Sequence, residues 1–275
     1  MINLSEGADR ALVARLGEAA GPILLDTHTD ADHNRSVLTL AGRPGPLLEA
    51  AAAVTERAVG CLDLAGHAGV HPRLGVVDVV PFVDLDEPWA PSTAASLSAR
   101  AQYATWAADE LALPCFLYGP ERTLPEIRRT AWRTLPPDVG PDRPHPTAGA
   151  VCVGARGVLV AYNLLVDAPA AIAQEVVREI RRPGLRALAF VTASGVQVSC
   201  NLTEPAQLGP ADAYDLVAGA LERRGARVTG AELVGLLPEA LLARIPQQRW
   251  ESLGVGPTQT IEARVRRPWS EGSRV

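Results

Sequence analysis

The chain contains no lysine, and all 26 of its basic residues are arginines. Without a lysine side chain, no Schiff base can form on the protein, which excludes that class of covalent catalysis. Aspartate and glutamate number 31, so the formal net charge is −5. An acidic chain lacks the basic surface that nucleic acids and anionic membranes attract, so neither is expected as a partner.

Cysteines and long apolar runs are also scarce. No apolar stretch approaches the length of a membrane span, and the first residues lack the pattern of a signal peptide. The four cysteines have no metal-ligand spacing and lie among apolar neighbours; they are Cys61, Cys115, Cys152 and Cys200. We interpret them as reduced core thiols, and we expect a cytoplasmic protein.

The composition is that of a folded protein, because 47% of the 275 residues are hydrophobic and 21% are charged. A chain of this length can bury one large core or two modest ones. Hydrophobic periodicity predicts helices over residues 8–20, 46–64, 92–111, 170–181, 210–224 and 239–245. Strands are expected over residues 22–26, 36–42, 76–80, 113–119, 151–156, 158–165, 187–190, 195–202 and 228–235. Periodicity alone does not distinguish an α+β fold from a doubly wound sheet.

The segment from Gly66 to Phe82 concentrates chemically active side chains. Valines on both sides of Asp78 predict a buried strand. A carboxylate inside such a strand costs several kcal/mol unless it is paired, and His67, His71 and Arg73 are its nearest candidate partners. The pattern indicates an acid/base cluster at the end of a strand. Alternatively, the histidines lie on the surface and the aspartate only fixes a neighbouring loop.

A second polar stretch combines three carboxylates and two histidines, which are Asp26, Asp30, Asp32, His28 and His33. These side chains are good ligands for divalent ions, so a metal site is one hypothesis. Neither a tight ligand motif nor a second cluster supports it, and we expect no metal.

Several motifs resemble those of the glutamate formiminotransferases, a family that moves a formimino group from N-formiminoglutamate to tetrahydrofolate. The longest is His-Ala-Gly-Val-His-Pro-Arg-Leu-Gly-Val-Val-Asp-Val-Val-Pro-Phe, which begins at His67. Others are Asn-Leu-Ser-Glu-Gly at Asn3, Asp-His-Asn-Arg-Ser-Val at Asp32, Ala-Tyr-Asn at Ala161 and Gln-Val-Ser-Cys-Asn-Leu at Gln197. The resemblance spans about residues 3–264 and ends before the cyclodeaminase module that some members append.

The resemblance implies an α+β fold with two consecutive ferredoxin-like subdomains, mixed or antiparallel sheets and a ligand tunnel between them. We assign residues 1–155 to the N-terminal subdomain, 156–267 to the C-terminal subdomain and 268–275 to a tail. Tetrahydrofolate is expected as co-substrate, without a metal, in a homodimer that serves histidine degradation. Family members usually carry an additional strand before Asn3, and nearly all of it is missing here, which indicates a late start or a trimmed sheet edge.

In this family the histidine before Pro-Arg is catalytic, which corresponds to His71. A single imidazole can accept the proton of the attacking amine and return one to the departing amine. The resemblance places His28 where the family has an aspartate implicated in catalysis. Asp78 is assigned to orienting or supporting His71, and Arg35 and Arg73 to binding substrate carboxylates.

The remaining candidates are assigned to substrate or folate binding by the resemblance; they are Asn3, Asn34, Gly140, Pro141, Gly149, Asn163, Gln197, Ser199 and Asn201. Strand alternation puts Gln197, Ser199 and Asn201 on one face. Residues 140–149 correspond to the family's folate-binding loop, although Ala148 stands where an aromatic residue is usual.

Two other functions stay open. One is a formimidoyltransferase that passes the group from formiminotetrahydrofolate to a different amine in specialised metabolism, which His28, Ala148 and the short first strand favour. The other is a folate-binding protein without catalysis, which the presence of His71 disfavours.

Overall fold

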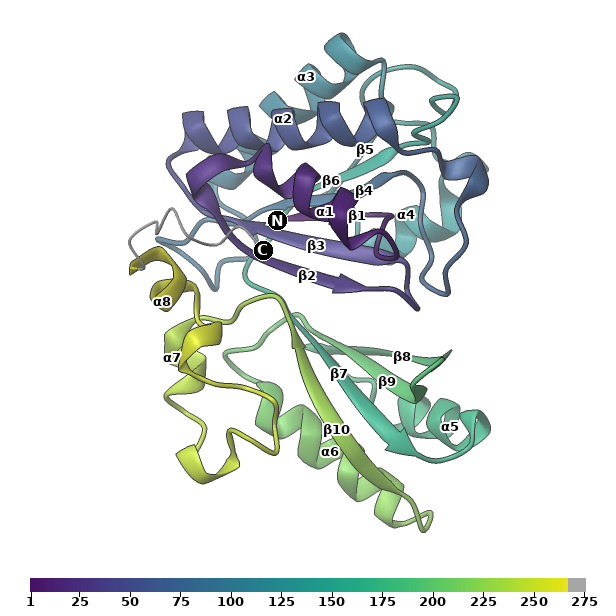
Figure 1. Cartoon of the computed structure of the whole chain (residues 1–275), viewed down its shortest axis with the longest axis vertical. Helices are drawn as coiled ribbons and strands as arrows, with labels where there is room; N and C mark the ends of the chain where they lie inside the picture. Colours follow the sequence, from purple (N-terminus) through teal and green to yellow (C-terminus); the bar gives the residue numbers. More distant parts are fainter. Residues whose placement is uncertain (267–275) are drawn as a thin grey trace. The chain divides into compact units, whose positions relative to one another are not determined.

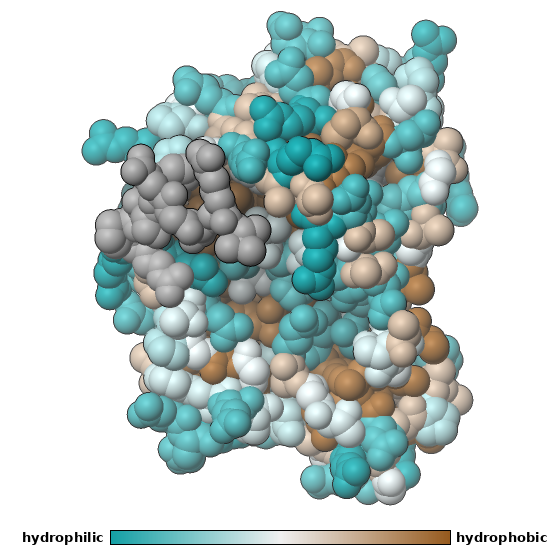
Figure 2. Space-filling view, in the orientation of Figure 1, coloured by the Kyte–Doolittle hydropathy of each residue, from teal (hydrophilic) through white to brown (hydrophobic). Residues whose placement is uncertain are grey.

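The computed structural model describes residues 1–266. Contacts between residues divide the chain into two compact units, Met1–Gly157 and a second unit that begins at Val158. No helix among these described residues is long and apolar enough to cross a membrane. Polar residues cover most of the surface that each unit shows in Figure 2, with small apolar patches between them.

The first unit is built on a six-stranded sheet (Figure 1). Its elements are β1 (Ile2–Leu4), α1 (Arg10–Glu18), β2 (Leu24–Asp30), β3 (Arg35–Leu40), α2 (Pro44–Cys61), β4 (Val77–Phe82), α3 (Ala94–Leu111), β5 (Cys115–Tyr118), α4 (Leu124–Thr130) and β6 (Val151–Ala155). The strand order is β2-β3-β1-β4-β6-β5. The first four strands are antiparallel and, with α1 and α2, form a ferredoxin-like βαββαβ motif, which β6 and β5 extend in parallel.

Helices α1, α2 and α3 cover one face of this sheet (Figure 1). Ile2, Leu4 and Leu38 point into the core that these helices close. Because side chains alternate along a strand, Asn3 and Arg35 lie on the opposite face. We call this surface of β2, β3 and β1 the helix-free face of the first sheet. Over β5 and β6 the same side is packed by α4, whose Ile127 is fully buried near Phe116.

The second unit repeats the same motif. Its elements are β7 (Val160–Asp167), α5 (Ala170–Ile180), β8 (Leu185–Thr192), β9 (Gly195–Leu202), α6 (Pro210–Glu222), β10 (Arg227–Val234), α7 (Glu239–Leu242) and α8 (Ile261–Arg266). The strands are antiparallel in the order β10-β7-β9-β8, and α5 and α6 pack on one face. The predicted α+β fold with two ferredoxin-like subdomains is therefore confirmed. Arg267 and the predicted tail 268–275 lie outside the described residues.

The structure differs from the sequence prediction in several places. Cys61 is exposed, so the expectation of a core thiol is wrong for this cysteine. Strand β2 extends to Asp30, beyond the expected end at residue 26. A trimmed sheet edge was one of two alternatives for the short N-terminal segment; in the structure β1 lies between β3 and β4 and pairs with both. Helix α4 was not predicted at all. Its first turn carries a capping pattern in which the Glu126 carboxylate accepts a hydrogen bond from the Thr123 amide at 2.6 Å. Pro125 in the first turn is also typical of a helix start.

Candidate active site

Asp78 reaches the helix-free side through an irregularity in the pairing of β4. Asn3 of β1 pairs with Val79 and Leu4 pairs with Val77, so Asp78 has no residue of its own opposite it. An extra residue of this kind is a β-bulge, which changes the direction of a side chain. Val77 and Val80 point to the core under α2 and α3, while Asp78 turns to the side of α4.

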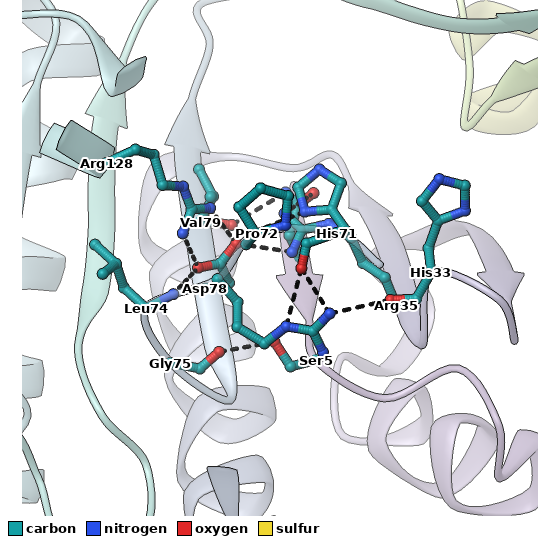
Figure 3. Close-up of polar contacts among 12 residues, drawn as sticks. Ser5, His33, Arg35, His71, Pro72, Leu74, Gly75, Asp78, Val79 and Arg128 are labelled. Atoms are coloured by element: carbon teal, nitrogen blue, oxygen red, sulfur yellow. Dashed lines mark hydrogen bonds and ion pairs between the residues drawn. The ribbon is translucent and has the colours of Figure 1, made fainter. Parts of the chain in front are cut away.

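The Asp78 carboxylate is fully buried and fully paired. Arg35 donates to Oδ2 at 2.7 Å, the Leu74 amide donates to Oδ1 at 2.8 Å, and Arg128 of α4 spans both oxygens, with its contact to Oδ1 at 2.8 Å (Figure 3). Burial alone would raise the pKa of Asp78, but the charges of Arg35 and Arg128 outweigh it and hold the pKa well below its usual range. One negative charge thus faces two positive charges, which leaves the cluster with a net positive charge.

These partners differ from the ones expected from the sequence. His67, His71 and Arg73 were proposed as partners of Asp78; the charge of Asp78 acts on His71 and Arg73, while Arg35, Arg128 and the Leu74 amide donate hydrogen bonds to it. The bulge turns the carboxylate toward β3 and α4 instead of toward the preceding loop. Only the backbone amide of Leu74 comes from that loop.

The loop that carries His71 is held by close backbone packing. A Cβ atom on Gly75 would lie 2.2 Å from the Ala150 carbonyl oxygen, and one on Gly149 would lie 2.3 Å from the Leu74 oxygen. Gly149 also has φ of 72°, in the left-handed region that favours glycine. Ser5 donates its hydroxyl to the Gly75 oxygen at 2.8 Å. The predicted folate residue Gly149 therefore lies directly beneath the His71 loop.

The His71 imidazole is oriented by its neighbour's backbone. Nδ1 lies 2.7 Å from the Pro72 carbonyl oxygen. Because a carbonyl can only accept, Nδ1 carries the hydrogen and Nε2 carries the lone pair. Burial, followed by the positive charge of Arg35, lowers the pKa of His71 to about 3, although Asp78 opposes this shift. The ring is therefore neutral near pH 7, and its Nε2 can accept a proton.

Arg73 connects the loop to the turn between β2 and β3. Its Nε donates to the His71 carbonyl oxygen at 3.1 Å and its Nη2 to the same oxygen at 2.6 Å and to the His33 oxygen at 3.3 Å. Nη1 contacts the imidazole of His67. Nε2 of the same imidazole lies 3.1 Å from the Asn34 backbone carbonyl oxygen. The guanidinium thus fixes the position of the His71 backbone.

Asn34, another predicted binding residue, also has a local structural role. Its side chain accepts hydrogen bonds from the Gly7 and Ala8 amides at 2.8 and 3.2 Å and donates to the Ala68 oxygen at 2.8 Å. Its φ of 45° is one that asparagine tolerates better than most residues. Asn34 joins the first turn, the β2–β3 turn and the His71 loop.

The same turn brings a second imidazole to the site. His33 lies with its ring centroid 6.2 Å from that of His71. Its Nδ1 is 2.9 Å from the Asp30 carboxylate, and hydrogen bonding from His33 is the main cause that lowers the pKa of Asp30 to about 2. The sequence analysis had considered His33 as a possible metal ligand and as part of the Asp-His-Asn-Arg-Ser-Val motif, but had not assigned it a role in the site.

Asn3, Arg35 and His28 share the helix-free face of the first sheet. Arg35 donates to the Asn3 side-chain oxygen at 3.0 Å, and Asn3 donates to the Val79 carbonyl oxygen at 3.1 Å. His28 is placed on this face by its pairing with Val37. Asn3 therefore extends the Asp78 cluster, while His28 lies on the neighbouring strand.

The four candidates of the second unit share the helix-free face of its own sheet. Asn163 of β7 pairs with Ser199 of β9, and Gln197 and Asn201 lie two residues to either side of Ser199. Asn163 donates to the Glu232 carboxylate of β10 at 3.4 Å. Asn163 and Gln197 are buried, whereas Asn201 is exposed. The four candidates form one polar row on two neighbouring strands, β7 and β9, as alternation predicted for β9.

Gly140 and Pro141 are placed differently from Gly149. A Cβ on Gly140 would lie 3.1 Å from that of Ala108 in α3 and 3.2 Å from the Leu113 oxygen. Gly140 has φ of 92°, which favours glycine. The two ends of the predicted folate-binding loop thus contact different parts of the first unit.

Sequence reasoning missed two residues that the structure brings to the site, Arg128 and His33. The capping pattern at Thr123 would have predicted α4, but no local signal places an arginine of α4 beside Asp78. The spacing of Asp30 and His33 across a turn was visible in the sequence. Among residues 1–266, no three His, Cys, Asp or Glu side chains are grouped so that they could hold a metal ion.

Arg128 offers a test of the cluster with a matched control. We expect Arg128→Gln to lower the free energy of unfolding by about 1–3 kcal/mol, because a buried carboxylate loses a bidentate partner while Arg35 remains. The neighbouring Arg129 is exposed, and Arg129→Gln should change stability by less than about 0.5 kcal/mol. Equal effects of the two substitutions in urea denaturation would contradict the assigned cluster.

The pH dependence of stability tests the charge of Asp78. Its pKa is lowered on folding, so its ionisation stabilises the folded state above the unfolded pKa of about 3.9, and this stabilisation is lost as the pH falls below that value. At pH 7, Asp78→Asn should lower the free energy of unfolding by about 3–5 kcal/mol, because two arginines lose their counter-ion. The difference between wild type and variant should narrow between about pH 4 and pH 2. A constant difference across this range would show that the carboxylate charge is not responsible.

Comparison with known proteins identifies the family. A family model described as the formiminotransferase domain, N-terminal subdomain, matches residues 1–156. The chain is 33% identical over 273 residues to a glutamate formimidoyltransferase of Streptococcus pyogenes, covering 89% of this chain and 90% of that protein. It is 30% identical over 298 residues to a glutamate formimidoyltransferase of Thermoplasma acidophilum, covering 96% and 95%. A formimidoyltransferase-cyclodeaminase of Gallus gallus is 32% identical over 269 residues, which are 86% of this chain and 49% of that longer protein. With matches that extend over most of the chain, this protein belongs to the formiminotransferase family and is a transferase enzyme of the formimidoyltransferase type.

Proposed function

We propose that the enzyme moves the formimino group between N-formimino-L-glutamate and tetrahydrofolate, giving 5-formiminotetrahydrofolate and glutamate. The observation that carries this proposal is His71, a neutral imidazole with its Nε2 as proton acceptor, on a loop fixed beside a positively charged cluster. Two relatives that the chain covers almost completely are named glutamate formimidoyltransferases, which supports the same reaction.

The reaction requires proton transfer at two nitrogens. The N5 amine of tetrahydrofolate attacks the amidine carbon, a tetrahedral intermediate forms, and the amine of glutamate departs. The attacking nitrogen loses a proton and the departing nitrogen gains one. A positioned imidazole contributes about 10²- to 10⁴-fold to such a step. His71 is the general acid/base of this proposal.

The pKa of His71 has a consequence for catalysis. A resting pKa of about 3 makes the imidazole neutral but a weak base. After burial, Arg35 is the next cause of this low value, and Arg128 contributes in the same direction. A substrate carboxylate bound beside these arginines would offset their charge and raise the pKa of His71. Binding of the anionic donor would thereby raise the pKa of His71 toward neutral pH, where a general base is most effective.

The net charge of the cluster assigns a role to its arginines. Arg35 and Arg128 together exceed the charge of Asp78, and both side chains keep some exposure, 11% and 18%. They are the groups suited to a carboxylate of the donor or of the folate tail. Arg73, by contrast, is engaged with two backbone carbonyls and with His67, so we assign it to positioning His71. Asp78 acts by charge, because the Pro72 carbonyl orients the imidazole.

The polar row of the second sheet suits the folate. Asn163, Gln197, Ser199 and Asn201 offer both donors and acceptors, as the edges of a pterin ring require. The resemblance also implies two formiminotransferase subdomains, a ligand tunnel and a contribution of residues 140–149 to folate binding, and these remain part of the proposed function. His28 is kept as a further candidate for contact with the substrate. The homodimer, the cytoplasmic location and the role in histidine degradation stay predictions.

Turnover by the purified enzyme tests the function directly. With formiminoglutamate and tetrahydrofolate, glutamate release should match the formation of 5-formiminotetrahydrofolate measured by mass spectrometry. We expect His71→Asn to lower kcat by about 10²- to 10⁴-fold with a small change in KM, because proton transfer is lost while binding groups remain. Unfolding curves would verify that the variant is folded.

Two results would overturn this proposal. Retention of more than a tenth of wild-type turnover by His71→Asn would exclude His71 as the essential acid/base group. Absence of glutamate release by wild type, together with transfer from 5-formiminotetrahydrofolate to another amine, would instead establish a different acceptor.

A further inference from the structure

We infer that Asp30 and His33 form a second proton-transfer pair of this site, in which His33 protonates the departing amine while His71 accepts the proton of the attacking amine. The inference rests on the proposed formimino transfer. It assigns the two proton transfers to two imidazoles rather than to His71 alone.

Asp30 fixes His33 at two points. One carboxylate oxygen accepts a hydrogen bond from the His33 amide at 2.8 Å, and the other lies 2.9 Å from Nδ1 of the ring. The His33 side chain is 6% exposed, so the ring is held in place by the protein and not by solvent. A carboxylate on Nδ1 sets the tautomer of the ring, and the inference assigns the proton transfer to Nε2, which is buried in this structure.

The spacing of the two imidazoles is set by the backbone. Arg73 donates from Nη2 to the carbonyl oxygens of both His33 and His71, which links the β2–β3 turn to the loop. Gly69 packs so closely on this turn that a Cβ would lie 2.5 Å from the His33 oxygen. The ring centroids are 6.2 Å apart and the rings are inclined by 56°. Figure 3 shows the His71 ring beside the Asp78 cluster and the His33 ring to its right.

The two imidazoles face charges of opposite sign. His71 lies near Arg35 and Arg128, with Asp78 as the opposing charge, and its pKa is lowered to about 3. His33 faces Asp30 from β2, with the His71 ring and the Arg73 guanidinium on the side of the loop. Asp30 is ionised near pH 7 and is a counter-ion for an imidazolium. The carboxylate on Nδ1 of His33 and the arginines near His71 are the grounds for assigning the acid to His33 and the base to His71.

The two proton transfers need no other reactant. The bond between N5 and the amidine carbon forms, and the proton on N5 passes to His71. The imidazolium of His33 gives its proton to the glutamate nitrogen, and the bond from that nitrogen to carbon breaks. The carbon–nitrogen double bond of the formimino group is restored on N5. His71 has gained a proton from N5 and His33 has lost one to the glutamate nitrogen, and exchange between the two imidazoles or with water resets the pair.

A donor that needs no acid separates this role from a structural one. We would compare formiminoglutamate with N-formimino-4-aminobenzoate, whose weakly basic aromatic amine departs without prior protonation. For His33→Asn we expect kcat to fall about 10²-fold with formiminoglutamate and less than 10-fold with the aromatic donor. For His71→Asn, both donors should lose activity to the same extent. Asp30→Asn should resemble His33→Asn with a smaller loss.

The pH profile gives a second readout from the same variants. If His33 is a proton donor, His33→Asn should no longer show the decrease in kcat at alkaline pH. A change in packing alone would lower kcat by the same factor at every pH. His33→Gln, compared with wild type for its unfolding midpoint, shows whether a loss of activity is a loss of folded protein.

Three outcomes have distinct meanings. If wild type transfers no formimino group at all, the proposed function fails. If wild type is active and the folded His33 variants keep kcat within 10-fold of it, the inference is overturned. It is also overturned if His33→Asn loses activity equally with both donors and keeps the shape of the wild-type pH profile. Where wild type does not use the aromatic donor, the pH profile alone decides.

Discussion

The ionised carboxylate of Asp78, which has no exposure to solvent, is the constraint on which the site depends. An unpaired charge in such a position costs several kcal/mol, so it has to be matched by its surroundings. The matching groups come from three segments far apart in the sequence, Arg35 of β3, Arg128 of α4 and the amide of Leu74. One side chain therefore ties the sheet, a helix and the His71 loop to each other. The bulge in β4 makes this possible, since without it Asp78 would point into the apolar core.

This arrangement also sets the chemistry of His71. Two arginines against one carboxylate leave a positive potential, which disfavours the imidazolium and attracts carboxylates. The orientation of the ring comes from the Pro72 carbonyl, and the position of the loop comes from Arg73 and from the contacts of Gly75 and Gly149. Asp78 contributes to both charge and geometry, because it also accepts a hydrogen bond from the Leu74 amide of the loop.

The sequence predicted most elements because their apolar residues have clear periodicity, as in α5 and the pair β8 and β9. It also indicated His71 and Asp78 as site candidates, because few segments concentrate such side chains. It did not predict which groups pair with Asp78. Local spacing favoured His67, His71 and Arg73, but a bulge depends on the register between β1 and β4, which no short pattern reveals. Arg128 was missed for a similar reason, since the contact joins positions 50 residues apart.

The two units follow one physical rule. In a βαββαβ motif the helices cover one sheet face, and the apolar side chains of each strand are needed there. Alternation then places every second side chain on the opposite face, where a polar group is not buried in the apolar core. Asn3 and Arg35 occupy such positions in the first sheet, and Asn163 and Ser199 do so in the second. Gly140 follows a different rule, because its backbone conformation and its contact with Ala108 serve the packing of α3. The apolar core therefore does not require the polar candidates on the helix-free faces, and their role in ligand binding stays a prediction.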